Sequence, residues 1–164
     1  MDMKMRKGSR QQNKADLEKF DIDSSIGFIV NRTAYMMRQR LQEGFRAQNH
    51  TTTPEEFALL RVLWKEDGRR QGELADYAIK DRTTVTRLID GLVRKGLVER
   101  RPDPADRRAV CTWLTRTGEA LEAKLVPIAH DLVARATIDV PQQNLDTTLN
   151  ALKKVQASLS SLKK

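Results

Sequence analysis

Hydroxyl and guanidinium groups are concentrated at residues 82–87, where the sequence reads RTTVTR. The chemistry that these groups offer is hydrogen bonding and charge pairing. Threonine can contact a base edge or a phosphate, and arginine can bind guanine through two parallel hydrogen bonds. The residues for which we predict contacts to DNA are Arg82, Thr83, Thr84, Thr86 and Arg87. The alternative is the solvated outer face of an ordinary surface helix.

One amphipathic helix must carry these side chains. Asp81 is a good N-cap because its carboxylate can accept hydrogen bonds from the first turn, and Gly96 supplies the left-handed residue that often follows a helix. Between them, apolar residues at helical spacing predict a buried stripe of Val85, Leu88, Ile89, Leu92 and Val93. The polar groups therefore belong to the opposite, outer face.

A charged hairpin is predicted directly after this helix. Residues 97–101 (LVERR) and 109–114 (AVCTWL) favour two strands, and PDPADRR between them supplies turn residues. Arg107 and Arg108 would lie at the tip, where arginine can enter the electronegative minor groove of A·T-rich DNA. Asp106 is expected to restrain a neighbouring arginine, since phosphates would repel its carboxylate. A charged surface hairpin is the alternative.

A shorter helix is predicted before the outer-face helix, over residues 73–79. Its small alanines would let the two helices of a helix-turn-helix approach closely. Arg69, Arg70 and Gln71 come just before it, and we predict that they contact the DNA backbone, which positions a protein without reading sequence. Residues 51–115 are therefore expected to form a winged helix-turn-helix DNA-binding lobe.

The segment DRTTVTRLIDGLVRKGLVERRPDPADRRAVCTWLT resembles the signature of MarR-type regulators, the multiple antibiotic resistance regulator family. The similarity rests on TVTRLID, KGLVER, DPADRR and the closing LT, and it extends over about residues 24–162. Thr112 departs from the pattern, because the family usually has an aliphatic residue there. The resemblance implies a mainly α fold with a small β-hairpin wing and a helical dimerisation lobe. It also implies a transcriptional regulator that binds double-stranded DNA as a homodimer. Such a regulator acts as a repressor, and a small molecule relieves the repression.

Three long helices are predicted outside the winged lobe. They run from Ser24 or Ser25 to about residue 47, from about residue 116 to 136 with a bend at Pro127, and from Pro141 almost to the C-terminus. The first and last carry apolar stripes that a small winged lobe cannot cover, so residues 21–50 and 116–164 are expected to form the dimerisation lobe. A twofold dimer would read a pseudo-palindromic operator. A monomer with its terminal helices packed together is the alternative.

The resemblance further implies a cleft between the two lobes for a small aromatic or anionic effector. In this chain the predicted contributors are Tyr35, Met36, Arg38, Phe57, Arg61 and Trp64. Helical spacing favours ordinary core positions for most of the apolar ones.

Charge favours a polyanionic partner, because the net charge is +8 and the pI is near 9.9. Residues 1–20 are predicted to be a mobile basic tail. No apolar run approaches the roughly 20 residues of a membrane span, and no signal-peptide segment is recognisable, which predicts a cytoplasmic protein without a membrane partner.

Residues suited to catalysis or metal binding are sparse. His50 and His130 have no carboxylate or cysteine at metal-ligand spacing, and no nucleophile motif or phosphate-binding glycine loop is present. The sequence therefore predicts that the protein is not an enzyme and that it binds no metal ion or cofactor. Cys111 is the only cysteine and is expected to be an inert strand residue; a redox role would need a lowered thiol pKa. Two other classes stay open, an architectural DNA binder without sequence preference and a winged-helix protein–protein adaptor.

Overall fold

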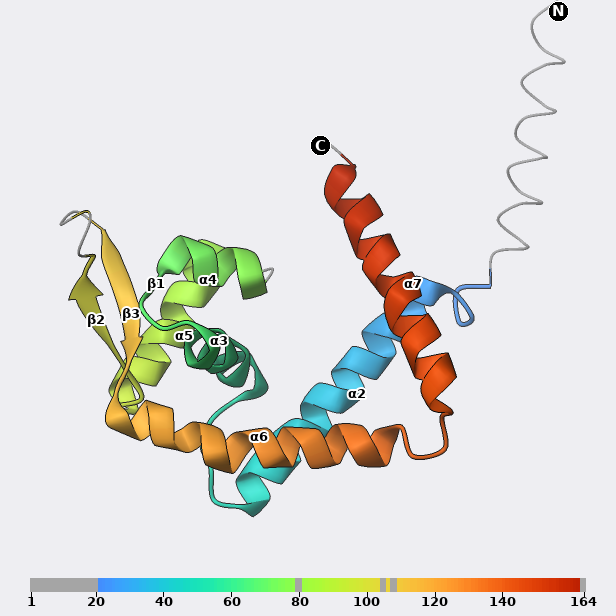
Figure 1. The fold of residues 1–164 in the computed structure, drawn as a ribbon, viewed down its shortest axis with the longest axis horizontal. Coiled ribbons are helices and arrows are strands. Elements are labelled where there is room, and N and C mark those ends of the chain that lie inside the picture. The colour runs from blue at the N-terminus through green and yellow to red at the C-terminus, as the bar shows by residue number, and fades with distance from the viewer. Residues whose placement is uncertain (1–20, 79–80, 104–105, 107–108, 163–164) are drawn as a thin grey trace, which may run out of the picture.

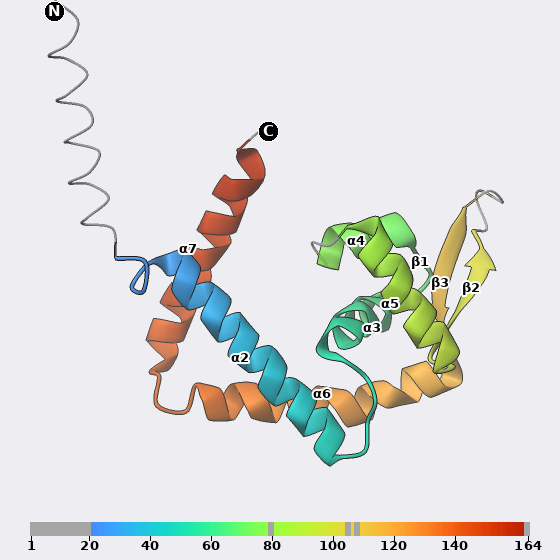
Figure 2. The same ribbon diagram turned by 180° about the vertical axis from the view of Figure 1, so that it is seen from behind.

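The computed structural model describes residues 21–78, 81–103, 106 and 109–162. Its elements in chain order are α2 (Ile26–Ala47), α3 (Pro54–Lys65), β1 (Arg69–Arg70), α4 (Gln71–Ala78), α5 (Arg82–Arg94), β2 (Val98–Pro102), β3 (Val110–Leu114), α6 (Arg116–Ala136) and α7 (Gln142–Ser161). The small sheet and helices α3, α4 and α5 gather at the N-terminal end of α6, while α2 crosses α6 and α7 leads away from its other end (Figure 1). Figure 2 shows the same arrangement from behind.

Short polar side chains cap the N-termini of α2, α3, α5 and α6. The Ser25, Thr53, Asp81 and Thr115 side chains accept hydrogen bonds from the backbone N–H groups of Phe28, Glu56, Thr84 and Gly118. Such caps satisfy N–H groups that have no partner within the helix. The predicted cap at Asp81 is confirmed, Thr115 caps α6, and Ser25 rather than Ser24 caps α2.

The core of the winged half lies between α3, α4, α5 and the sheet. It is built from aliphatic side chains: Leu59, Leu60, Leu63, Leu74, Ala75, Val85, Ile89, Leu92, Leu97, Val98 and Leu114. Three of the five residues predicted for the α5 stripe are buried, Leu88 is partly buried, and Val93 is 37% exposed. This core fixes the inner face of α5 and thereby the direction of its outer face.

A second core joins α2 to α3 and α6. Phe45 and Phe57 meet edge to face with ring centroids 5.3 Å apart, and Leu125 and Ile128 of α6 complete the cluster. Gly44 permits the close crossing of the helices, since a Cβ there would lie 2.8 Å from the Ile128 side chain. The helix α6 continues on both sides of Pro127.

The sheet has three antiparallel strands in the order β1-β3-β2, with Arg69 opposite Thr112 and Arg100 opposite Thr112 on the other side. The predicted wing strands β2 and β3 and the mainly α fold are confirmed. No pattern in the sequence predicted β1, so the expectation of a two-stranded hairpin was incomplete. Thr112 is 2% exposed on the central strand, where it pairs with Arg69 on one side and Arg100 on the other.

Helix α7 and the first turns of α2 stand apart from both cores. No residue of α7 is buried, and Ile26, Ile29 and Val30 on α2 are 57%, 50% and 42% exposed. The predicted apolar side of α2 is therefore covered only toward its C-terminal end. Among the helices that the structure describes, none is long and apolar enough to cross a membrane.

Candidate nucleic-acid interface

The outer face of α5 divides into free and engaged side chains. Arg82, Thr83 and Arg87 are exposed, and their side chains make no hydrogen bond or ion pair with the described residues. An uncommitted donor on the N-terminal half of a helix that projects from a packed core is available to a base edge or phosphate. Three of the five predicted α5 contacts are therefore free to bind a partner.

Two hydroxyls on the same helix are already engaged. Thr84 donates to Asp81 Oδ2 at 2.7 Å, and this bond, with the one from the Thr84 backbone N–H, holds the pKa of Asp81 below its usual value. Thr86 donates to the Arg82 carbonyl at 2.8 Å and accepts from the Gln71 side chain. Both hydroxyl protons are therefore donated within the chain, and neither is left for a base.

The three predicted backbone contacts also have partners within the chain. Arg69 pairs with Glu66 and lies 3.7 Å from Glu73, while the Gln71 amide also donates to the Arg82 carbonyl at 3.2 Å. Arg70 Nε donates to Asp103 at 2.6 Å, and the Asp103 carboxylate raises the pKa of Arg70. Their contacts to phosphate stay a prediction, since ion pairs at these sites would have to be shared or exchanged.

Two ion pairs orient the hairpin beside α5. Arg100 on β2 donates to Asp90 on α5 at 2.7 Å, and Asp103 at the end of β2 binds Arg70 on β1. Asp103 also accepts from the Asp106 backbone N–H at 3.3 Å. Arg107 and Arg108, predicted for the wing tip, lie outside the described residues, as does any restraint of them by Asp106.

Cys111 lies on the wing strand β3 with 3% of its surface exposed. Burial and a thiol hydrogen bond to Asp103 at 3.5 Å raise the pKa of Cys111. A protonated, covered thiol is a poor nucleophile. These surroundings favour the inert strand residue over the redox alternative.

A cavity of about 580 Å³ lies between α2, α3 and α6, in the region predicted for an effector. Its walls include Arg38, Phe57 and Arg61 from the predicted set, together with Met37, Leu41, Pro54, Glu55, Ala58, Ala78, Ala129, Leu132 and Val133. Tyr35 and Met36 do not line it; each is 54% exposed on another side of α2. Trp64 is a core residue instead, since its indole N–H donates to the Gly118 carbonyl at 2.9 Å.

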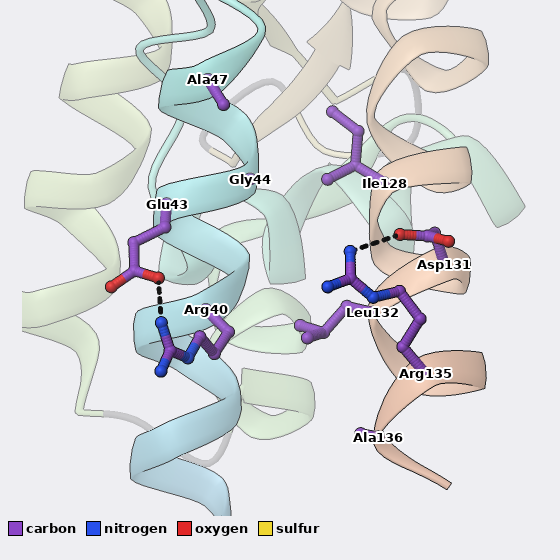
Figure 3. Close-up of a pocket in the computed structure, with 9 residues that line it drawn as sticks. All are labelled: Arg40, Glu43, Gly44, Ala47, Ile128, Asp131, Leu132, Arg135 and Ala136. Carbon is purple, nitrogen blue, oxygen red and sulfur yellow. Dashed lines mark hydrogen bonds and ion pairs between the residues drawn. The ribbon is translucent and has the colours of Figure 1, made fainter. Parts of the chain in front are cut away.

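A second cavity, of about 730 Å³, opens on the other side of the α2–α6 crossing (Figure 3). Its cations are paired within the chain, Arg40 with Glu43 at 2.8 Å and Arg135 with Asp131 at 3.5 Å. The first cavity offers more apolar surface from Phe57 and its neighbours beside two arginines. It is therefore the better match for an aromatic anion.

Sequence reasoning missed the polar groups that hold the interface in place. Asp103, Asp90 and Lys95 bind residues far along the chain, so no local pattern marks them. Thr53 and Glu56 form a capping box, which the spacing T-x-x-E could have revealed. In the described part of the chain, no cluster of three or more histidine, cysteine, aspartate or glutamate residues could hold a metal ion.

Comparison with known proteins agrees with this architecture. Residues 52–110 match the sequence model of the MarR family. The transcriptional regulator HosA of Escherichia coli O111:H- is 30% identical over 107 residues, covering 63% of this chain and 79% of HosA. Apo MarR from E. coli superposes with a TM-score of 0.67 at 27% identity, covering 80% of this chain and 96% of MarR. Bordetella bronchiseptica BpsR superposes with a TM-score of 0.76 at 22% identity, over 84% and 96% of the two chains.

The residues that match the family model include α5, its Asp81 cap and the ion-paired base of the wing. In this segment, Arg82, Thr83 and Arg87 are exposed on the outer face of α5, while its inner face packs in the core. The chain therefore belongs to the MarR family and is a transcriptional regulator, not an enzyme.

Proposed function

We propose that the protein binds a pseudo-palindromic operator in double-stranded DNA as a homodimer, and that it represses transcription until a small effector releases it. The observation that carries the DNA-reading part is the outer face of α5, where Arg82, Thr83 and Arg87 have no partner among the described residues. The net charge of +8 suits the phosphate backbone. Such a regulator acts in the cytoplasm, where the DNA lies.

The test of DNA reading is Arg87→Ala. Loss of one bidentate guanine contact is expected to cost about 1–3 kcal/mol of binding to the preferred duplex. The probe is the tightest duplex recovered by selection from a random-sequence pool, and affinity is measured by fluorescence anisotropy at about 150 mM salt. Arg46→Ala is the control, because it removes the same charge from an exposed site at the end of α2. Equal loss in both variants would mean that only net charge matters.

Selectivity separates this proposal from the two other classes. An architectural binder would hold the selected and scrambled duplexes equally and with a steep salt dependence. A protein–protein adaptor would bind neither duplex at this salt. Arg108→Ala extends the test to the wing, where we expect a cost of about 1–3 kcal/mol on the selected duplex.

The dimer is proposed from apolar surface that a single chain leaves open. Leu149 and Leu159 on α7 are 55% and 61% exposed, Leu162 just after it is 71% exposed, and the first turns of α2 expose Ile26 and Ile29. A contiguous apolar face of this kind is typical of a protein–protein interface. A second copy of the same two helices would cover it by twofold symmetry.

Leu159→Asp tests the dimer. A carboxylate buried in an apolar interface has no partner and should shift the molecular mass in sedimentation from twice the 18.7 kDa chain mass to the chain mass itself. Asn150→Asp adds the same charge to α7 on the opposite side of the helix and should leave the dimer intact. A monomeric wild type would contradict the proposal outright.

The effector is proposed to be an aromatic anion held in the 580 Å³ cavity by Arg38 and Arg61 against Phe57. A relative supports this class of ligand, since the BpsR structure concerns regulation of its DNA binding by 6-hydroxynicotinic acid. Release would follow if the ligand favours a spacing of the two α5 helices that does not match the operator.

Thermal unfolding with a panel of aromatic carboxylates and their neutral amides tests the effector site. A ligand at 100 times its Kd should stabilise the fold by about 2.7 kcal/mol. Arg61→Met should weaken the preference for the acid over its amide, since only Arg38 remains, while Arg40→Met, at the other cavity, should leave it unchanged. If the second variant abolishes the preference instead, the ligand binds on the other side of α2.

A further inference from the structure

Thr86 is the residue of the α5 outer face whose hydrogen-bonding groups are most fully used inside the protein. Its hydroxyl proton goes to the Arg82 carbonyl at 2.8 Å, and its oxygen accepts from the Gln71 amide, which also donates to the Arg82 carbonyl at 3.2 Å. The hydroxyl is thus held between α4 and α5 from two directions.

A threonine whose hydroxyl is fixed inward presents its γ-methyl as the remaining contact group. Thr86 lies one turn after Arg82 and one turn before Asp90, on the strip of α5 that also carries Thr83. In the major groove, the one apolar group on a base edge is the C5-methyl of thymine, and threonine methyl groups are suited to it.

We propose that Thr86 recognises thymine by contact between the two methyl groups, and that Gln71 is a positioning residue that fixes the Thr86 rotamer. The proposal rests on the proposed DNA-reading function of α5. It assigns to Thr86 a different role from Thr83, which has no partner among the described residues and keeps a hydroxyl proton to donate. Thr84 is not equivalent, since its hydroxyl belongs to the helix cap.

The test replaces thymine by deoxyuridine, one position at a time, in the duplex selected from a random-sequence pool. Wild-type protein should lose affinity about fourfold at one thymine in each half-site, which is the value of one methyl contact. Thr86→Ser keeps both hydrogen bonds but has no methyl, so its thymine-to-deoxyuridine affinity ratio should fall to one. Thr86→Val keeps a methyl and should keep a ratio of about four.

Gln71→Met tests the positioning role through the same ratio. Without the amide, the Thr86 hydroxyl keeps only its bond to the Arg82 carbonyl and turns outward more readily, so the ratio should drop below that of the wild type. In a Thr86→Val background there is no hydroxyl to turn, and Gln71→Met should leave the ratio unchanged. A loss of affinity with an unchanged ratio in both backgrounds would make Gln71 merely structural and overturn its assigned role.

These experiments distinguish a failure of the thymine contact from a failure of DNA reading by α5. If no duplex is enriched, DNA reading itself fails and the thymine contact fails with it. If a duplex is enriched but the ratio stays at one for wild type, or stays near four for Thr86→Ser, the methyl contact alone is wrong. If Thr86→Val loses the ratio and Thr86→Ser keeps it, the hydroxyl oxygen reads the base, and the proposal is overturned.

Discussion

Gly118→Ala is expected to lower the free energy of unfolding by about 3 kcal/mol, although alanine favours helix over glycine. A Cβ at this position would overlap the Leu97 carbonyl oxygen and lie 3.2 Å from Leu114 Cδ2. That carbonyl already accepts from the Thr115 backbone N–H at 3.1 Å, so it belongs to the junction between the hairpin and α6. Backbone cannot move aside as the end of a flexible side chain can.

Two further bonds make this junction rigid. The Gly118 N–H donates to the Thr115 hydroxyl oxygen at 3.1 Å, and the Gly118 carbonyl accepts from the Trp64 indole at 2.9 Å. Relief of the clash by shifting α6 would stretch both. The substitution should therefore loosen α3 and the wing together, at the end of α6 where the winged half is attached.

Urea unfolding followed by circular dichroism, at one chain concentration for every variant, measures this effect. Gly72→Ala is the matched control, because a Cβ there meets nothing within 4 Å and its helix should gain about 0.5–1 kcal/mol. A Gly118→Ala protein as stable as wild type would mean that the α6 junction can rearrange at little cost.

The parts of the fold that sequence predicted are those that local signals specify. The α5 boundaries followed from one cap and one glycine, since Asp81 binds the Thr84 N–H and Gly96 has φ of 66°. The hairpin followed from turn residues and β-branched strands. A two-residue strand has no period, so β1 was visible only once β3 was in place beside it.

The sequence predicted which residue types lie at the candidate site, but not which of their hydrogen-bonding groups are free of partners within the chain. The prediction treated Thr83 and Thr86 alike, yet only the structure separates an unpartnered hydroxyl from one held by Gln71, which lies 15 residues away. Arg70 and Asp103, 33 residues apart, form an ion pair for the same reason: tertiary folding brings together groups that no sequence window contains. The exposure of the first turns of α2 could not be predicted either, because it depends on which other elements pack against them.

Lys95→Met is the second variant for which we expect a large effect, a loss of about 3–5 kcal/mol in the free energy of unfolding. Lys95 caps the C-terminus of α5, and its Nζ donates to Glu56 Oε2 at 2.6 Å and to the Thr51 carbonyl at 2.8 Å. The Glu56 side chain is only 6% exposed. Removing the lysine leaves a buried carboxylate without its counter-charge. Urea unfolding again measures the loss.

The exposed pair Arg40–Glu43 is the matched control. Its side chains are 69% and 58% exposed, so Arg40→Met should cost less than about 1 kcal/mol. If Lys95→Met also costs less than about 1 kcal/mol, water reaches Glu56 and the Lys95–Glu56 pair behaves as a surface pair.

Because Glu56 also accepts from the Thr53 N–H at 2.8 Å, the pair ties the first turn of α3 to the end of α5. The neighbouring Pro54 and Glu55 line the cavity assigned to the effector. Glu56→Gln combined with Lys95→Met should lose less stability than the two single losses added, since the double variant buries no uncompensated charge. The same double variant should bind the selected duplex with a weaker response to effector, because the polar link between the first turn of α3 and the end of α5 is then lost. An unchanged response would place the coupling between cavity and recognition helix elsewhere.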